Sequence, residues 1–307
     1  MLRFLVRRVL SAVPTTLIVV TLAFFLIRFA PGGPFTLERA LAPQIMENMM
    51  RAYHLDDPLW RQYLDYIWNA MHGDFGPSFI YRDFTVAELI AQGLPYSVKL
   101  GAIALTLALL LGVSIGTLAA LRQNSPLDHL VMAGATIGLT VPNFVVGPTL
   151  SLIFAVGLSW ASSGGWGQGT IRDLALPIVT LALPQLAIFA RLTRGSMIEA
   201  LRTDHVRTAR AYGLGWRTVV VVHALRGALL PVVSYFGPAA AGVLTGSIVV
   251  ETVFAIPGVG RYFVLAAINR DYTLVMATVL LIGIFIIAFN LIVDLLYGVL
   301  DPRVRYD

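Results

Sequence analysis

The chain has 307 residues, of which 57% are hydrophobic and 13% are charged. Soluble domains carry about 25% charged residues, so this composition predicts a polytopic membrane protein. The sequence contains no cysteine, which excludes disulfides, thiolate metal sites and a cysteine nucleophile. The net charge of +5 is distributed along the chain as expected for membrane orientation and not for nucleic-acid binding.

The first predicted element is a transmembrane helix at the N-terminus. Three arginines within the first eight residues precede an uncharged run from Val9 to Ile27. At 1.5 Å per residue this run spans about 28 Å, close to one hydrocarbon core. A cleaved signal peptide is the alternative, but the run is long for one, and Arg28 to Pro31 is a poor cleavage site. We therefore expect residues 1–30 to be a retained anchor with its N-terminus inside the cell.

A polar segment, residues 31–96, is predicted to form an extracytoplasmic loop with two amphipathic helices. In the second helix, Asp57 can cap the start, Pro58 can be the first helical residue, and Gly73 marks the stop. Apolar residues recur between them at helical spacing, namely Trp60, Leu64, Ile67, Trp68 and Met71. We expect this face to pack on the outer ends of the spans or to lie in the membrane interface, with ligand binding by a tryptophan as the lesser alternative.

The second and third spans are predicted from two further uncharged stretches. Residues from Leu100 to Leu121 form the second span. The stretch from Leu130 to Ile171 is too long for one span, and Pro142 breaks it because proline removes a helix hydrogen bond and restricts its predecessor. We expect a membrane-entering helix before Pro142 and the main third span after it, to about Trp160.

Three more spans complete a set of six. The fourth runs from about Leu174 to Ala190, where two prolines are expected to kink it. The fifth runs from about Ala228 to Val250 and is rich in glycine and alanine, so we expect it to pack closely and centrally. A loop containing Ile256–Gly260 follows, and the sixth span runs from about Tyr272 to Leu300.

The distribution of charge orients these spans. With six spans and the N-terminus inside, the inner side holds 13 of the 22 basic residues and six of the 17 acidic ones, a net charge of +7. The outer side then has a net charge of −2. Short inner loops rich in arginine are expected for cytoplasmic segments, so both termini are predicted to lie in the cytoplasm.

The segment between the fourth and fifth spans is predicted to begin with a short helix. Thr203 and Asp204 suit the start, since a side-chain oxygen can accept from a free backbone N–H there, and Gly213 suits the stop. Val206 and Ala209 share one face of this helix with Tyr212 or Gly213. Arginines flank that face. A helix of about 10 residues with two arginines cannot be buried in lipid. It is either a membrane-surface helix or a docking helix for a partner protein. Charge alone favours an arginine-rich loop that only sets the orientation of the spans over a docking role.

The sequence offers little that would support catalysis. A phosphate-binding P-loop needs Gly-x-x-x-x-Gly-Lys-Ser/Thr, and the one lysine, Lys99, lies in no such context. The five histidines are scattered without metal-ligand spacing, and no Gly-x-Ser-x-Gly elbow is present. Glu251 and Asp294 are the acids nearest the membrane interior, and we expect a structural role for both because they can lie at span ends. We assign no catalytic residue and no metal site.

The order of residues in the loop resembles the coupling-loop signature of permeases of ABC importers. That signature reads Glu-Ala-Ala, three residues, Gly, nine residues, Ile-x-Leu-Pro. Set on Gly213, it places Arg207, Thr208 and Ala209 at Glu-Ala-Ala. Arg207, His223 and Arg226 depart from the signature. These departures match the peptide-permease branch of the family, whose loop reads like RTARAYGL followed by HALRGALLPV.

Further motifs extend the resemblance to dipeptide and oligopeptide permeases over nearly the whole chain. They are GDFGPSF (73–79), HALRGALLPVVSYFGPA (223–239), ETVFAIPGVGRYF (251–263), NRDY (269–272) and a C-terminal signature that runs from Phe289 to Asp301-Pro302-Arg303. The resemblance implies the type I fold of ABC-importer permeases. In this fold residues 97–307 would form a five-span core with a cytoplasmic coupling loop at residues 194–227.

The resemblance also implies partners and a site. A second, homologous permease subunit would pair with this chain, two ATPase subunits would use ATP and Mg²⁺ inside, and a peptide-binding protein would deliver substrate outside. This chain would bind no cofactor and would not be an enzyme. The ATPase-docking coupling helix would comprise Thr203, Asp204, Val206, Arg207, Thr208, Ala209, Arg210, Tyr212 and Gly213. Within it, we expect Ala209, Tyr212 and Gly213 to make close contact with the ATPase, and Arg207 and Arg210 to meet acidic residues.

Several alternatives stay open at the level of sequence. The resemblance is greatest to bacterial oligopeptide permeases, which implies transport of oligopeptides across the bacterial inner membrane. Dipeptides, glutathione, nickel chelates or opine-like compounds are the alternative cargoes, and no substrate path can be assigned. A secondary transporter or channel would need buried titratable relays or inverted repeats, neither of which is evident. An intramembrane enzyme would need a nucleophile or metal set at membrane depth.

Overall fold

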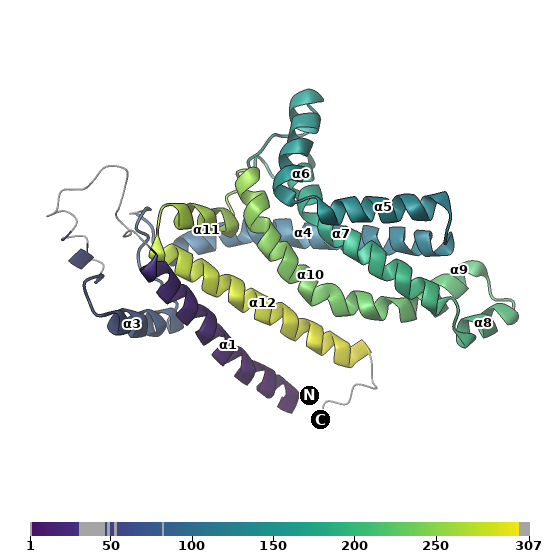
Figure 1. Cartoon of the computed structure of the whole chain (residues 1–307), viewed down its shortest axis with the longest axis horizontal. Coiled ribbons are helices and arrows are strands. Elements are labelled where there is room, and N and C mark those ends of the chain that lie inside the picture. Colours follow the sequence, from purple (N-terminus) through teal and green to yellow (C-terminus); the bar gives the residue numbers. More distant parts are fainter. Residues whose placement is uncertain (1, 31–46, 48–49, 52–53, 82, 301–307) are drawn as a thin grey trace. The chain divides into compact units, whose positions relative to one another are not determined.

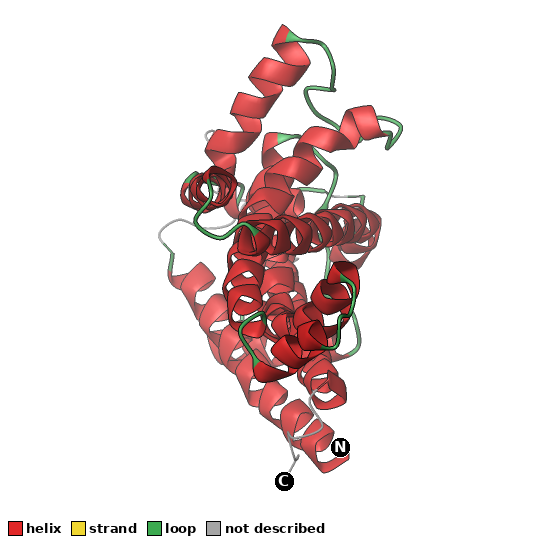
Figure 2. Cartoon of the chain, turned by 90° about the vertical axis from the view of Figure 1, so that its right-hand side faces the viewer, coloured by secondary structure: helices red, strands yellow, loops and turns green. Residues whose placement is uncertain are grey.

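The computed structural model describes residues 2–30, 47, 50–51, 54–81 and 83–300, with side chains described only between residues 10 and 292. Within these residues the structure is helical, apart from turns, loops and one isolated antiparallel bridge between Pro77 and Thr85 (Figure 2). The all-α prediction is therefore confirmed. The first of the two amphipathic helices predicted in the polar segment lies outside the described residues.

Most of the helices are labelled along the chain in Figure 1. Their bounds are α1 Leu2–Phe29, α3 Leu59–Met71, α4 Val86–Leu121, α5 Pro126–Thr140, α6 Asn143–Leu150, the π-helix η1 Ser151–Gly157, α7 Ile171–Ala200, α8 Asp204–Ala211, α9 Trp216–Thr218, the π-helix η2 Val219–Ala224, α10 Leu225–Val253, α11 Val259–Ile268 and α12 Tyr272–Leu300.

Among the described residues, five helical segments are long and apolar enough to cross a membrane. A sixth candidate is the pair formed by α5 and the helix of α6 and η1, which meet at an angle of 106°. The break falls at Val141 and Pro142, where the backbone is extended. The predicted interruption of the third span is thus confirmed, and six spans result when the bent pair counts as one.

The structure corrects several predicted boundaries. α4 begins at Val86 and not at Leu100. α7 is one continuous helix that contains both Pro177 and Pro184 and extends to Ala200. The region after Ile256, predicted as a loop, contains the ten-residue helix α11. The sixth span begins and ends as predicted.

The predicted ends of the amphipathic helix α3 are nearly correct. Pro58 directly precedes the helix, whose first residue is Leu59, so Pro58 is not its first helical residue. Asp57 makes no capping contact in the structure, since the residue at the capping position is Pro58 and it has no side-chain cap. Gly73 follows the last turn with a φ of +78°, the left-handed conformation that glycine adopts at little cost.

The chain divides into two compact units, and the first comprises residues 1–97 and 257–285. Its core includes Val86 and Leu89 of α4, packed against Ala266 of α11 and Leu274 of α12. Gly93 allows α4 and α11 to approach, because a β-carbon there would lie 2.9 Å from the ring of Tyr262.

The second unit comprises residues 98–256 and 286–307 and is organised around α7. α7 packs against α5, α6 and α10. Glycine also allows it a close approach to α4, where a β-carbon on Gly112 would lie 2.6 Å from that of Phe189. On α10, a β-carbon on Gly242 would lie 2.5 Å from the amide nitrogen of Gln185. Close packing was expected of this glycine-rich and alanine-rich span, and it is observed here. The predicted division of the chain into an anchor (1–30), an extracytoplasmic loop (31–96) and a core (97–307) stays a prediction.

Candidate functional site

The predicted helix between the fourth and fifth spans is present as α8. It begins after Thr203 and ends before Gly213, whose φ is +76°. The glycine stop is therefore confirmed. The predicted side-chain cap is wrong, because the Thr203 hydroxyl donates to the carbonyl oxygen of Ala200 at 2.6 Å and accepts no backbone N–H. Thr203 thus ties the start of α8 back to the last turn of α7.

One face of α8 is buried within the chain. Val206 and Ala209 are covered by an apolar cluster, which we call the α8 seat. The seat is built from four other elements and consists of Ala120 of α4, Met197 and Ala200 of α7, Val219, Val220 and Ala224 of η2, and Ala228 of α10. Because it draws on the ends of these elements, α8 cannot move without disturbing the helices that hold it.

The opposite face of α8 is exposed and basic. Arg207, Thr208 and Arg210 are exposed, and the Asp204–Arg207 ion pair, at 3.5 Å between two highly exposed side chains, contributes little to stability. Tyr212 is 81% exposed and does not join Val206 and Ala209 on the buried face, as one reading of the spacing had it. The tyrosine follows the last helical residue, so the helical spacing that predicted its face no longer applies there.

Burial of Val206 and Ala209 reduces the surface of α8 that a partner protein can contact. The side chain of Ala209 is almost fully covered by the chain itself. The expectation that Ala209 makes close contact with another protein stays a prediction, and its covered side chain leaves little surface for such contact. Tyr212 and Gly213, both exposed, stay available for such contact.

A second link joins α8 to the π-helix that follows it. The Nε2 atom of His205 lies 3.3 Å from the backbone carbonyl oxygen of His223 in η2. π-Helical turns widen the backbone and are frequent at functional sites. This feature could not be predicted from the residues, since a π-turn has no residue pattern of its own.

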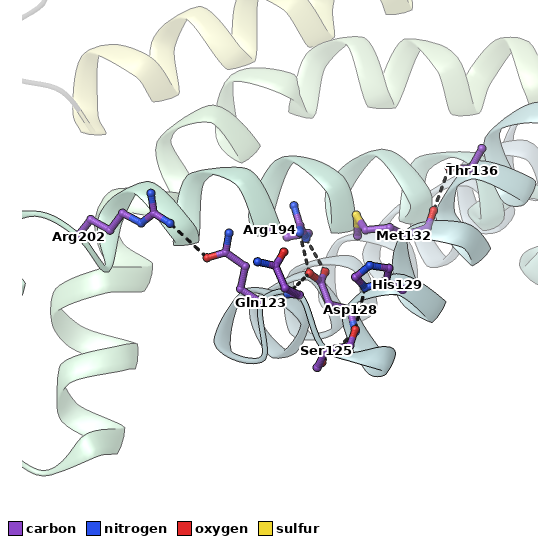
Figure 3. Close-up of polar contacts among 9 residues, drawn as sticks. Gln123, Ser125, Asp128, His129, Met132, Thr136, Arg194 and Arg202 are labelled. Atoms are coloured by element: carbon purple, nitrogen blue, oxygen red, sulfur yellow. Dashed lines mark hydrogen bonds and ion pairs between the residues drawn. The ribbon is translucent and has the colours of Figure 1, made fainter.

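A buried ion pair lies in the same unit, at the end of α7 that leads to α8 (Figure 3). The carboxylate of Asp128, in the first turn of α5, accepts from Arg194 at 2.5 Å from Nε and 2.7 Å from Nη2. Bidentate pairs of this kind are among the strongest charge-assisted hydrogen bonds. Asp128 is buried and Arg194 is partly buried, so solvent screens the pair less than a surface contact.

The turn between α4 and α5 is fixed by the same carboxylate. The backbone N–H of Asn124, which has a φ of +64°, donates to Asp128 at 2.9 Å. Ser125 caps α5 by accepting from the Asp128 backbone N–H at 3.3 Å. Nearby, Arg202 donates to the side chain of Gln123 at 3.4 Å (Figure 3). The contacts of Arg194 and Arg202 join the turn between α4 and α5 to the segment directly before α8.

Sequence reasoning missed the Asp128–Arg194 pair. Both residues entered only as charges on the inner side of the membrane. They are 66 residues apart, and each lies in a different helix. The one available signal was that Asp128 is the sole acid between Glu88 and Asp173, and an isolated charge that becomes buried needs a partner.

The turn-rich motif GDFGPSF is held by a different carboxylate, in the first unit. Asp271 is fully buried directly before α12. It accepts from the hydroxyl of Ser78 and the backbone N–H of Phe79, at 2.5 and 3.1 Å. Its other oxygen accepts from the hydroxyl of Thr273 and the backbone N–H of Leu274, at 2.9 and 3.1 Å. Four donors satisfy the charge, so Asp271 fastens the motif to the start of α12.

The acids singled out from sequence have the expected positions where the structure describes them. Glu251 is fully buried in the last turn of α10. The side chain of Asp294 lies outside the described residues, as do Asp301, Pro302 and Arg303. Among the residues that are described, no group of three or more His, Asp or Glu side chains is placed to hold a metal ion.

Comparison with known proteins relates this arrangement to a transport family. Residues 112–306 match the model of the binding-protein-dependent transport system inner membrane component. Residues 1–101 match the model of the N-terminal part of such membrane components. The two matches together cover most of the chain.

Curated relatives match over the full length. The oligopeptide transport system permease protein OppB of Salmonella typhimurium is 51% identical over 306 residues, with 100% of each chain covered. The protein of the same description from Haemophilus influenzae is 50% identical with the same coverage. The dipeptide transport system permease protein DppB of Bacillus subtilis is 40% identical, with 99% of this chain and 98% of that protein covered.

Proposed function

The chain belongs to the family of binding-protein-dependent transport system inner membrane components, and from this premise we propose that it translocates oligopeptides as one permease subunit of an ATP-driven importer. The observation that carries the cargo class is full-length identity of 51% to an oligopeptide permease, against 40% to a dipeptide permease. Dipeptides are therefore the second candidate.

The proposed import needs partners. Dependence on a binding protein belongs to the description of the family, and here this protein would deliver the peptide. We infer in addition a second, homologous permease subunit, which would supply the other half of the path, and two ATPase subunits, which would use ATP and Mg²⁺. The present chain has no P-loop sequence, which supports placing ATP hydrolysis on separate subunits.

Within this assembly α8 is proposed to be the ATPase-docking helix. Its exposed side carries Arg207, Arg210 and Tyr212, and its buried side is held by the α8 seat. A basic face of this kind fits an acidic groove. When the ATPase pair closes on ATP, a helix held in such a groove moves with it. The seat then passes the movement to α4, α7, η2 and α10.

The same proposal fixes the orientation of the chain. α8 must face the cytoplasm, where ATP is available, and the arginine-rich inner loops support this orientation. With six spans, the N-terminus and the C-terminus then both lie in the cytoplasm.

Uptake by a strain that lacks its own peptide permeases tests the function. The strain is supplied with this chain and the other subunits of its transporter, and uptake of a labelled tripeptide and pentapeptide is measured with dipeptide as competitor. We expect ATP-dependent uptake of both peptides and weak competition by dipeptide. Preferred uptake of dipeptide would assign the other cargo. Uptake driven by a proton gradient without ATP would contradict the proposed mechanism.

A further inference from the structure

The amphipathic helix α3 is packed along the C-terminal part of α1. Tyr63 and Ile67 of α3 pack against the cluster formed by Val20, Phe24 and Met276. The hydroxyl of Tyr63 lies 2.7 Å from that of Thr21. One side of α3 is therefore fixed to the first span and to α12 by specific contacts.

These contacts set the depth of α3 relative to the apolar run of α1. The candidate span in α1 runs from Leu10 to Phe29, about 30 Å, which is the thickness of a hydrocarbon core. Thr21 lies eight residues before Phe29, about 12 Å along the helix. Because Tyr63 reaches a residue inside the span, α3 lies beside the last turns of the span and not beyond its end.

A second face of α3 is apolar and uncovered. Trp60, Leu64, Trp68 and Met71 are between 56% and 68% exposed, and no residue of α3 is buried. The neighbouring surface of α1 is equally apolar, with Leu22, Leu26 and Phe29 exposed. Both helices thus present uncovered apolar side chains.

The charged residues of α3 form a separate stripe that continues to Asp57, just before the helix. Arg61 lies 3.7 Å from Asp57 and 3.9 Å from Asp65, and the three residues follow one another at a spacing of four. A helix with apolar and charged stripes side by side, and with tryptophans on the apolar one, has the pattern of helices that lie in a membrane interface. Such helices bury their apolar face about 5–10 Å into the boundary between headgroups and acyl chains. The contact of Tyr63 with Thr21, about 12 Å inside the end of the candidate span, lies slightly deeper than this range.

We propose that α3 is an interfacial lipid anchor whose face Trp60–Leu64–Trp68–Met71 binds the leaflet around the C-terminal end of α1. Lipid is the occupant because the face lies at the depth of the span, where a soluble binding protein cannot reach it. The anchor holds the chain that leads into the GDFGPSF motif, which Asp271 fastens to α12. This inference depends on the membrane location of the chain and is independent of its cargo and of the role of α8.

Two neighbouring residues provide a matched test. Leu64 and the side chain of Asp65 are exposed to 56% and 62% in the chain alone, so an aqueous environment would make them equally reactive after substitution by cysteine. The chain has no cysteine of its own, so Leu64→Cys and Asp65→Cys each introduce a single thiol. A thiol surrounded by lipid does not ionise readily and reacts slowly with maleimides.

The experiment uses the assembled transporter in phosphatidylcholine vesicles and a membrane-impermeant maleimide. We expect Asp65→Cys to be labelled at least about tenfold faster than Leu64→Cys. Equal rates would overturn the proposal. If the two rates differ only after the binding protein is added, the face belongs to that protein and the proposal is also overturned.

Tryptophan fluorescence provides a second measurement that does not alter α3. In a variant with Trp160, Trp166 and Trp216 replaced by phenylalanine, the remaining tryptophans are Trp60 and Trp68. We expect their emission to be quenched by phosphatidylcholine brominated near the headgroup more than by lipid brominated near the chain end. Quenching by aqueous iodide without quenching by either brominated lipid would contradict the proposal.

Discussion

α3 and α8 are both short helices outside the candidate spans, and they expose faces of different chemistry. α8 buries its apolar residues Val206 and Ala209 in the seat and exposes arginines. α3 buries no residue and exposes two tryptophans, a leucine and a methionine. Since an apolar face is stable only where water is excluded, the two helices require different surroundings. A protein partner in water fits α8, and lipid fits α3.

The largest expected effect comes from a charge in the seat. Val206→Asp places a carboxylate among the apolar side chains of the seat, at a cost on the order of 4 kcal/mol. We expect peptide uptake to fall to background while the chain still inserts in the membrane. Uptake is measured per amount of chain in the membrane fraction.

Val206→Leu is the matched control for this substitution, because it keeps the seat apolar and adds a single methylene, which costs less than a buried carboxylate. We expect it to retain most of the uptake. Equal uptake by the Asp and Leu variants would show that α8 needs no buried apolar face. The contrast with α3, which buries none, would then have no functional meaning.

Charge reversal on the exposed face of α8 tests the docking role of that face and leaves the α8 seat unchanged. The double variant Arg207→Glu, Arg210→Glu should lower uptake at least about tenfold, since each tenfold corresponds to 1.4 kcal/mol of lost interaction. The free energy of unfolding should change by less than about 0.5 kcal/mol, because both side chains are exposed. Uptake and thermal unfolding of the purified complex are the two measurements.

Arg51→Glu serves as the control for charge reversal, because Arg51 is also exposed but lies in the polar segment expected outside. It should leave uptake unchanged. If the α8 reversal behaved like this control, its basic face would not be a docking surface.

Loss of the Asp128–Arg194 ion pair is expected to lower the free energy of unfolding. Asp128→Asn keeps the shape of the side chain and removes its charge, so Arg194 loses its partner. We expect the free energy of unfolding to fall by about 2 kcal/mol. A double-mutant cycle with Arg194→Gln checks the cause, since the effects of a true pair are not additive. Additive effects would mean that the two side chains do not stabilise one another.

The smallest effects distinguish the two faces of α3. In detergent-solubilised complex, Ile67→Ala should lower the free energy of unfolding by about 1 kcal/mol because Ile67 packs against α1 and α12. Leu64→Ala should change it by less than about 0.5 kcal/mol because Leu64 is exposed. Both effects are measured by thermal unfolding. A larger loss for Leu64→Ala than for Ile67→Ala would mean that Leu64, and not Ile67, packs against the span.

The spans were predictable because each depends on local composition alone. A long uncharged run forms a helix in lipid, whatever its neighbours, since its backbone groups can be satisfied only internally. The break at Pro142 and the glycine stop of α8 also follow from single residues with restricted or unusual backbone preferences. α11 was missed because a helix of ten residues is too short to stand out as a span.

The contacts that hold the site were not predictable in the same way. Asp128 and Arg194 are 66 residues apart, and Ser78 and Asp271 are 193 residues apart, so their pairing depends on how the helices pack. Tyr212 shows the same limit within a single segment. Its spacing from Ala209 allowed a shared face, but the helix ends at Ala211, and the tyrosine faces outward.

Cross-linking from α8 tests the central proposal most directly. Tyr212→Cys introduces a single exposed thiol into a chain without cysteine, and it can be paired with single cysteines along the groove of the ATPase subunit in membrane vesicles. We predict a disulfide between this position and the ATPase, and labelling by an impermeant maleimide only in inside-out vesicles from which the ATPase has been removed. Labelling in right-side-out vesicles, or no cross-link to any ATPase position, would contradict the assignment of α8.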